Sequence, residues 1–261
     1  MKHFRVVILV IALLGSAAYK ANQILNPYLE LAGKERLITI LLYSDVKNRD
    51  VLLRELRLFI CQEELCVFNQ IPKIIGEEFA RYTGQETTFT LKAYEPVDDQ
   101  LFTFDFPESG VDRLKFVYRL YQEFRKRGAS FFGSDIRIFI NISDYDANNY
   151  EETSMGSANL RTGFIQWDVA DQFKNVRMWN LTKLMHEIGH TLGASDKYLD
   201  VGKSAFPDGY IQPELGENSN QSYVEIMSGT RPTGTPKEAE PIHPGQLRFG
   251  AQSAMEMGWL R

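Results

Sequence analysis

Cysteine is nearly absent from this sequence, whose 261 residues include only Cys61 and Cys66. Small secreted proteins that depend on a disulfide framework carry many more cysteines, so this chain must rely on a conventional hydrophobic core. The composition allows such a core, because 44% of the residues are hydrophobic and 24% are charged. These proportions exclude a wholly disordered chain.

A strong charge of one sign is also lacking. The formal net charge is −5, and the basic residues are scattered along the sequence. Proteins that bind nucleic acids typically gather Lys and Arg in one patch, so we predict no nucleic-acid partner.

Long apolar runs are absent except for Val6–Leu14, which follows Lys2 and Arg5 near the N-terminus. A membrane-spanning helix needs about 20 apolar residues, and Lys20 ends this run early. Small residues follow the run up to Ala18, as they do at a signal-peptidase site. The pattern therefore predicts a signal peptide and a protein that is secreted or held in the cell envelope.

The predicted organisation has three parts. Residues 1–18 form the signal peptide, residues 19–35 form a linker, and residues 36–261 form one domain. The alternative is that the first segment is an uncleaved anchor, which is the only contact with a membrane that we expect.

The sequence around His186 has the spacing of a metal site. His186 and His190 are four residues apart, so on a helix both imidazoles lie on one face and can bind one ion. Glu187 lies beside them, where a general base belongs. Gly193 can end the helix, and the turn after it can bring Asp196 back as a third ligand. Two histidines and one carboxylate leave a fourth position open, as in catalytic zinc sites, so the predicted cofactor is Zn²⁺.

A methionine in a tight turn follows, within Glu225–Gly229. The segment from His186 to Asp196, followed by Met227, resembles the metzincin zinc metalloproteases, whose motif is H-E-x-x-H-x-x-G-x-x-H with a methionine turn downstream. This chain has Asp196 where the family usually has histidine, as in metzincins of the snapalysin type. The resemblance implies an α/β (α+β) domain with a mixed, twisted sheet, an active-site helix and Met227 beneath the metal.

Other third ligands remain open in the sequence. His243 lies beyond the methionine turn, and Glu214 or Glu217 lies at a distance that a thermolysin-like enzyme can use. Gly193 and Met227 argue against the thermolysin-like arrangement, so Asp196 is preferred.

The resemblance implies a zinc-dependent endopeptidase that acts on peptide or protein substrates. Glu187 would take a proton from a zinc-activated water and pass it to the leaving amine. Family members often have a tyrosine just after the methionine turn, but Ser228 stands here, so Tyr198 and Tyr223 are candidates for that role by elimination. One alternative function is a non-catalytic zinc-binding scaffold, which would have no use for Glu187. The other is a zinc hydrolase that acts on a non-protein amide.

Hydrophobic periodicity predicts the other elements. The expected strands are 37–43, 56–60, 87–94, 136–140 and 162–167. The expected helices are 71–83, 111–127, 252–259 and the metal-binding helix. We expect the metal-binding helix to begin at Asn180 as N-cap and to bury Leu181, Leu184, Met185, Ile188 and Leu192.

Two strands are expected to have particular neighbours. The order strand, helix, strand from 87 to 140 predicts that strands 87–94 and 136–140 are parallel and lie side by side. By resemblance, strand 162–167 lies where the edge strand of the active site pairs with substrate. An ordinary buried strand is the equal alternative.

Two further features remain hypotheses. In an exported protein the leading interpretation of Cys61 and Cys66 is a disulfide, with inert thiols or a zinc-capping cysteine as alternatives. Asp144, Asp146 and Asn148 have the spacing of a calcium loop, but the glycine and glutamate of an EF-hand are missing, which favours a solvated loop.

Overall fold

The computed structural model describes most of the chain from Leu31 onward. The described residues are 31–44, 46–47, 49–60, 67–97, 110–144, 154–169, 176–200, 202–235 and 237–260. The predicted signal peptide, the cysteine pair and the acidic loop after Asp144 lie outside them.

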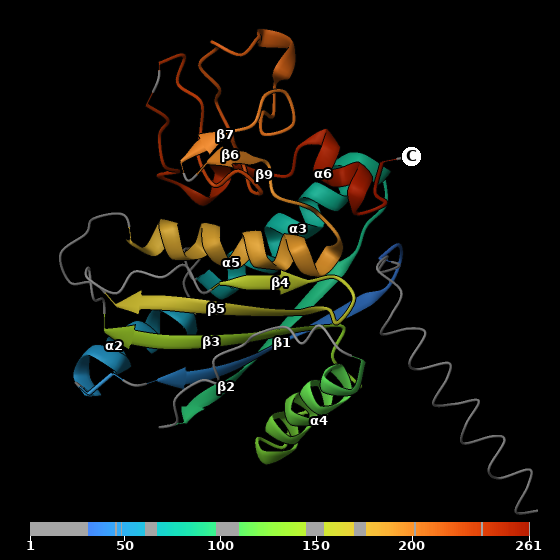
Figure 1. The fold of residues 1–261 in the computed structure, drawn as a ribbon, viewed down its shortest axis with the longest axis vertical. Helices are drawn as coiled ribbons and strands as arrows, with labels where there is room; N and C mark the ends of the chain where they lie inside the picture. Colours follow the sequence, from blue (N-terminus) through green and yellow to red (C-terminus); the bar gives the residue numbers. More distant parts are fainter. Residues whose placement is uncertain are drawn as a thin grey trace, which may run out of the picture.

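A five-stranded sheet forms the centre of the fold (Figure 1). Its strands are β1 (Glu35–Ser44), β2 (Thr88–Val97), β3 (Ile136–Asp144), β4 (Met155–Ser157) and β5 (Thr162–Val169). Their order across the sheet is β2-β1-β3-β5-β4, and all neighbours are parallel except β4, which is antiparallel to β5. The predicted α/β fold with a mixed, twisted sheet is confirmed.

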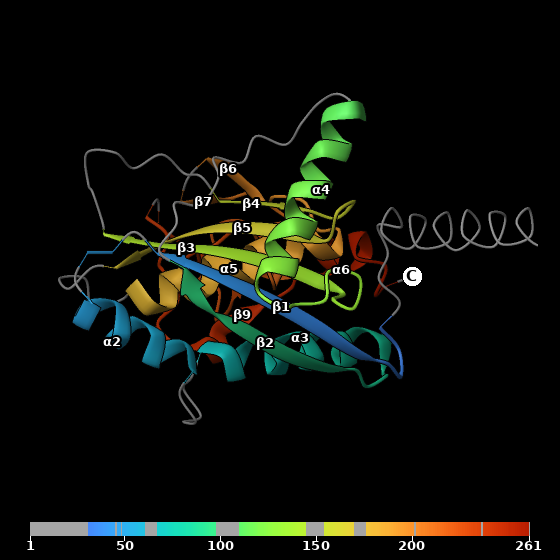
Figure 2. The same ribbon diagram turned by 90° about the horizontal axis from the view of Figure 1, so that it is seen from below.

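Helices cover both faces of the sheet (Figure 2). They are α2 (Arg49–Ile60), α3 (Val67–Thr83), α4 (Gly110–Lys126) and α5 (Val176–Leu192). Ile40 and Ile138 point to the face that carries α2, α3 and α5, whereas Leu41 and Phe139 point to the face that carries α4. Both faces of β1 and β3 therefore carry buried apolar side chains.

Residues 56–60 are helical, so the strand predicted there is wrong. They form the end of α2, which begins at Arg49. Leu52 and Leu56 both pack against the core, and their separation of four residues is helical. Asp50 lies in the first turn, where a negative charge interacts favourably with the helix dipole.

The predicted neighbours in the sheet are also wrong. β2 and β3 are parallel, but β1 lies between them and pairs with both. β1 is buried from Ile38 to Ser44, and the central position lets helices cover both its faces while neighbours satisfy both its edges. β5 is the ordinary buried strand, because β3 and β4 flank it and β4 is the edge.

The metal-binding helix begins earlier than expected. α5 starts at Val176, so Asn180 is an interior helical residue, 1% exposed, and not the N-cap. The predicted apolar stripe is confirmed, since each of its members is at most 2% exposed. The stripe comprises Leu181, Leu184, Met185, Ile188 and Leu192.

The chain after α5 lies on the side of that helix away from the sheet (Figure 1). Its short elements are β6 (Tyr198–Asp200), β7 (Lys203–Ser204), η1 (Pro213–Leu215), β8 (Val224–Glu225), η2 (Pro244–Gln246), β9 (Leu247–Arg248) and α6 (Ala251–Glu256). The short helix predicted at 252–259 corresponds to α6. This segment contacts α3, where the Phe249 amide donates to Glu78 Oε2 at 2.9 Å.

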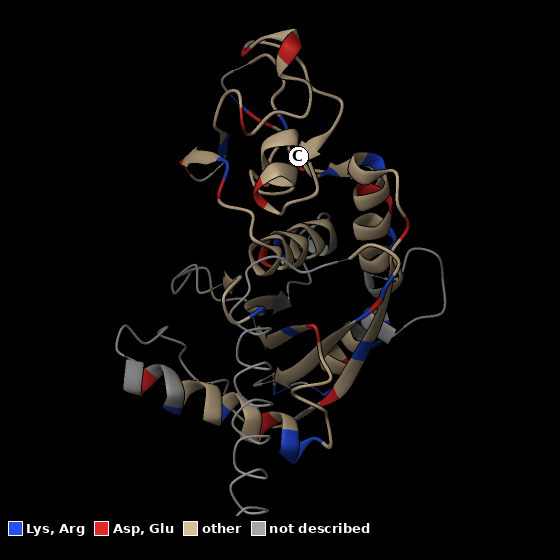
Figure 3. Ribbon diagram, turned by 90° about the vertical axis from the view of Figure 1, so that its right-hand side faces the viewer, with Lys and Arg blue, Asp and Glu red and all other residues tan. Residues whose placement is uncertain are grey.

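Within the described part of the chain, no helix combines the length and the apolarity needed to cross a membrane. Acidic and basic residues are interspersed over the ribbon (Figure 3).

Candidate metal centre

α5 carries the two candidate histidines on the face opposite its apolar stripe. The helix ends at Gly193, whose φ of 111° is a conformation that favours glycine. The Ala194 amide donates to Gly189 O at 3.0 Å, which closes the end of the helix. The chain then turns back, and this reversal places Asp196 beside the histidines, as the spacing predicts.

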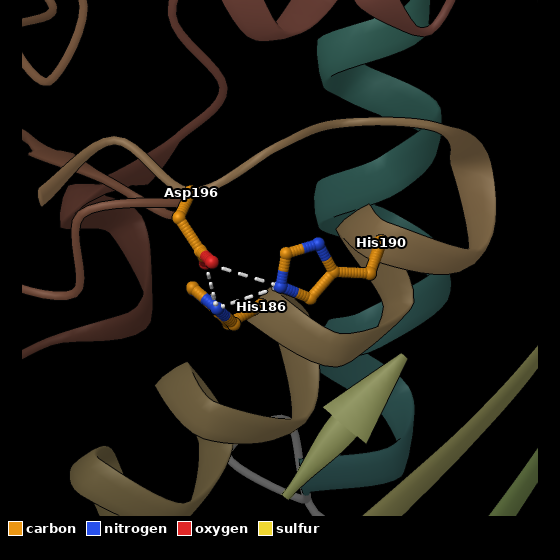
Figure 4. A group of neighbouring side chains, drawn as sticks. All are labelled: His186, His190 and Asp196. Atoms are coloured by element: carbon orange, nitrogen blue, oxygen red, sulfur yellow. Dashed lines mark hydrogen bonds and ion pairs between the residues drawn. The ribbon is translucent and has the colours of Figure 1, made fainter. Parts of the chain in front are cut away.

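Three ligand atoms meet at one point (Figure 4). Asp196 Oδ1 lies 3.0 Å from His186 Nε2 and 3.2 Å from His190 Nε2. The two Nε2 atoms are 3.1 Å apart. Among the described residues, this is the only group of His, Cys, Asp or Glu side chains with the geometry of a metal site.

The protonation of the histidines fits a cation. His190 Nδ1 donates to Ala194 O at 2.9 Å and His186 Nδ1 to Ile226 O at 3.2 Å, because a carbonyl oxygen only accepts. In neutral imidazoles, both Nε2 atoms therefore direct lone pairs toward the carboxylate of Asp196. Three converging lone pairs need either protons or a metal ion between them. Tetrahedral zinc ligands at about 2.0–2.1 Å lie about 3.3–3.4 Å apart, close to the spacing found here.

The short distances between the two histidines and Asp196 shift the pKa values of Asp196 and His190. Hydrogen bonds from His186 and then His190 hold the pKa of Asp196 far below its usual range. Burial, the largest single cause, lowers the pKa of His190, but the hydrogen bonds with Asp196 and Ala194 and the negative charges of Glu187 and Asp196 together outweigh it, so the net shift is upward. The site therefore favours positive charge.

Glu187 lies beside the ligands and is 4% exposed. Burial, the largest cause, raises its carboxyl pKa to about 7 even though the two neighbouring histidines act in the opposite direction. Its Oε2 atom is buried and has no hydrogen-bond partner among the described residues. A carboxylate in this condition can exchange a proton near neutral pH.

The predicted methionine turn is present beneath the histidines. The amides of Ser228 and Gly229 both donate to Glu225 O at 3.0 Å, and Met227 is fully buried. Its thioether packs against Gly189 of α5, where a side chain would collide with it.

The three candidate ligands line a pocket of about 430 Å³. α5, β4, the β6–β7 hairpin and the chain after Met227 form its walls. Tyr198 lines the pocket with its ring stacked 6.1 Å from that of His186, whereas Tyr223 packs against the guanidinium of Arg248. Of the two candidate tyrosines, Tyr198 is therefore the one beside the metal centre.

The alternative third ligands lie elsewhere. The exposed side chain of His243 caps η2, where its Nδ1 accepts from the Gly245 amide at 3.0 Å. Glu214 and Glu217 are exposed and are not among the residues gathered with the histidines.

Sequence reasoning missed two features of the site. The first is the edge strand β4, whose Gly156 lies against α5 beside Glu187 and His190. The second is Glu256 of α6, which holds the residues on either side of Asp196. Neither has a local sequence signal, because a three-residue strand and a contact between residues far apart in the chain leave no periodic pattern.

Gly156→Ala is expected to destabilise the fold by about 1–3 kcal/mol. The added methyl group would lie 2.6 Å from Glu187 O and 2.5 Å from His190 Cβ, and backbone cannot move aside cheaply. Chemical denaturation measures the change. Gly76→Ala is the matched control, because its methyl group meets only Thr87 O at 3.4 Å and the helix should gain about 0.5–1 kcal/mol. Equal effects of the two variants would contradict the close approach of β4 to α5.

Comparison with known proteins gives similarity in fold only. No family model and no curated protein sequence matches the chain. Wild-type OgpA from Akkermansia muciniphila matches with a TM-score of 0.43 and 13% identity, over 88% of this chain and 62% of that one. Metalloproteinase-II from Bacteroides fragilis matches with a TM-score of 0.37 and 13% identity, over 92% of this chain and 60% of that one. The chain thus spans less than two thirds of the length of these proteins, and the functional argument rests on its own site.

Proposed function

We propose that this chain is a zinc-dependent endopeptidase of the metzincin type, with His186, His190 and Asp196 as metal ligands. The observation that carries the proposal is the meeting of three lone-pair donors in one pocket, beside the buried Glu187 Oε2, which has no hydrogen-bond partner among the described residues. A structural metal site would not need that carboxylate.

Zinc is the metal that suits these ligands best. Imidazole nitrogen together with one carboxylate oxygen is a typical catalytic zinc set, with fewer protein ligands than a closed structural site has. When bound, zinc supplies a Lewis acid that makes water more acidic and polarises a carbonyl group.

Glu187 is the proposed general base. Its pKa of about 7 lets it take a proton from the attacking water and give that proton to the leaving amine. Tyr198, which lines the pocket beside His186, is the proposed donor of a hydrogen bond to the developing negative charge on the carbonyl oxygen.

The edge strand β4 supports a peptide as the substrate. Met155 and Gly156 line the pocket, and among the described strands β4 pairs only with β5. The free edge of a strand can pair with an extended peptide through backbone hydrogen bonds. We also propose export, based on the residues before Tyr19, because extracellular peptidases act outside the cell that makes them.

Casein cleavage with and without a metal chelator tests this function. Cleavage should disappear when the chelator removes the metal and should return on addition of Zn²⁺. A chain that binds zinc stoichiometrically but cleaves neither casein nor a peptide library would be a scaffold or an amide hydrolase of another class.

A further inference from the structure

Of the three candidate ligands, Asp196 is the one whose side chain is least constrained by its surroundings. Its side chain is 45% exposed, compared with 14% for His186 and 18% for His190. The histidines are fixed by their helix and by hydrogen bonds from their second ring nitrogens. Asp196 lies beyond the end of that helix, so neither burial nor helical geometry fixes its direction.

Hydrogen bonds hold the residues on both sides of Asp196. Before it, the Ser195 amide donates to Glu256 Oε2 at 2.7 Å, and the Ser195 hydroxyl donates to the same oxygen at 3.0 Å. After it, the Lys197 amide donates to Met227 O at 2.9 Å. Residues 195–197, the ligand loop, are therefore attached to α6 on one side and to the methionine turn on the other.

The ammonium group of Lys197 also binds the carboxylate of Glu256. Lys197 Nζ lies 2.9 Å and 2.8 Å from the two oxygens of Glu256, and its side chain is only 3% exposed. A buried ammonium group needs a charged partner. Burial, the largest single cause, raises the pKa of Glu256, but its hydrogen bonds with Lys197, Ser195 and Gln252 and the charge of Lys197 together outweigh it, so the net shift is downward.

α6 is itself firmly anchored. The hydroxyl of Ser253 donates to the buried carboxylate of Glu225. Trp259, just beyond the helix, packs edge-on against Phe249 and Phe79, with ring centroids 5.6 Å apart in each pair. The carboxylate of Glu256 therefore extends from a fixed support.

We propose that Glu256 is a positioning residue of the metal centre. Its carboxylate neutralises Lys197 and holds Ser195, and in this way it directs the Asp196 side chain toward the two histidines. The inference depends on the proposed function only through the assignment of Asp196 as a metal ligand.

The affinity for Zn²⁺ tests this role. Glu256→Ala in the full chain is expected to weaken zinc binding by about 10–100-fold, the usual effect of removing a partner that orients a ligand. The measurement is competition with a chromogenic chelator. Glu256→Gln should lose less, because its amide oxygen can still accept from the Ser195 amide although the charge opposite Lys197 is gone.

Glu238→Ala is the matched control. Glu238 also accepts hydrogen bonds from the Ser204 amide, the Ser204 hydroxyl and the Thr230 hydroxyl, but it holds the β6–β7 hairpin and not the ligand loop. Zinc affinity should be unchanged in this variant. Thermal unfolding in excess chelator separates any general loss of stability from the effect on the metal.

A double-variant cycle decides between positioning and general support. If Glu256 acts through Asp196, Glu256→Ala should have no further effect on zinc affinity once Asp196→Ala is present. An equal loss in both backgrounds, or wild-type affinity in Glu256→Ala, would overturn the proposal. Zinc binding is measured without peptide cleavage, so a chain that behaves as expected here but cleaves nothing would refute only the proposed function.

Discussion

Replacing Glu187 with glutamine is expected to reduce peptide hydrolysis by about 10²–10⁴-fold and to leave bound zinc at the wild-type level. The substitution keeps the size of the side chain but removes its ability to accept a proton. Glu187 lines the pocket, its Oε2 atom has no partner among the described residues, and burial raises its pKa to about 7. The measurements are kcat/KM on a peptide substrate and zinc per chain by elemental analysis.

Glu225→Gln is the control for this variant. The Glu225 carboxyl is also buried, and burial raises its pKa to about 7 as well. It does not line the pocket, and the glutamine amide oxygen can still accept from Ser253, so the substitution should affect hydrolysis far less. Undiminished hydrolysis in Glu187→Gln would contradict the proposed role of Glu187 as general base.

Asp196→Ala is expected to have the second large effect, a sharp loss of bound zinc. The proposed site has three protein ligands and would keep only the histidines. Asp196→His should retain part of the zinc, because imidazole is also a zinc ligand. Recovery should be incomplete, since histidine is longer than aspartate and the loop around it is held by Ser195 and Lys197. Elemental analysis after dialysis measures bound zinc in each variant.

His243→Ala is the control for the third ligand. This side chain caps η2, so its loss should leave zinc stoichiometry unchanged. Full zinc in Asp196→Ala together with loss in His243→Ala would reverse the assignment.

Features set by local spacing could be predicted from the sequence. The apolar stripe of α5, the meeting of His186 and His190, and the return of Asp196 after Gly193 all depend on residues within a few turns of one another. The strand expected at 37–43 is also present, as part of β1.

Features set by distant pairing could not be predicted. A short apolar run such as 56–60 fits a strand or a helix, and its packing against the core decides between them. The central place of β1 follows from pairing across the sheet and not from the order of elements along the chain. Ser195 and Glu256 are separated by 61 positions, and nothing near either residue indicates their contact.

The uneven exposure of the three ligands sets the route by which an ion can leave. The histidine side chains are mostly covered, whereas nearly half of the Asp196 side chain faces solvent. A competing ligand from solution can therefore reach the site while the domain remains folded, and the rate of metal exchange should depend on the concentration of that competitor rather than on global unfolding. If the protein is the zinc enzyme proposed above, its bound zinc would be accessible to solution, and the concentration of free zinc around the protein would control how much of the enzyme is active.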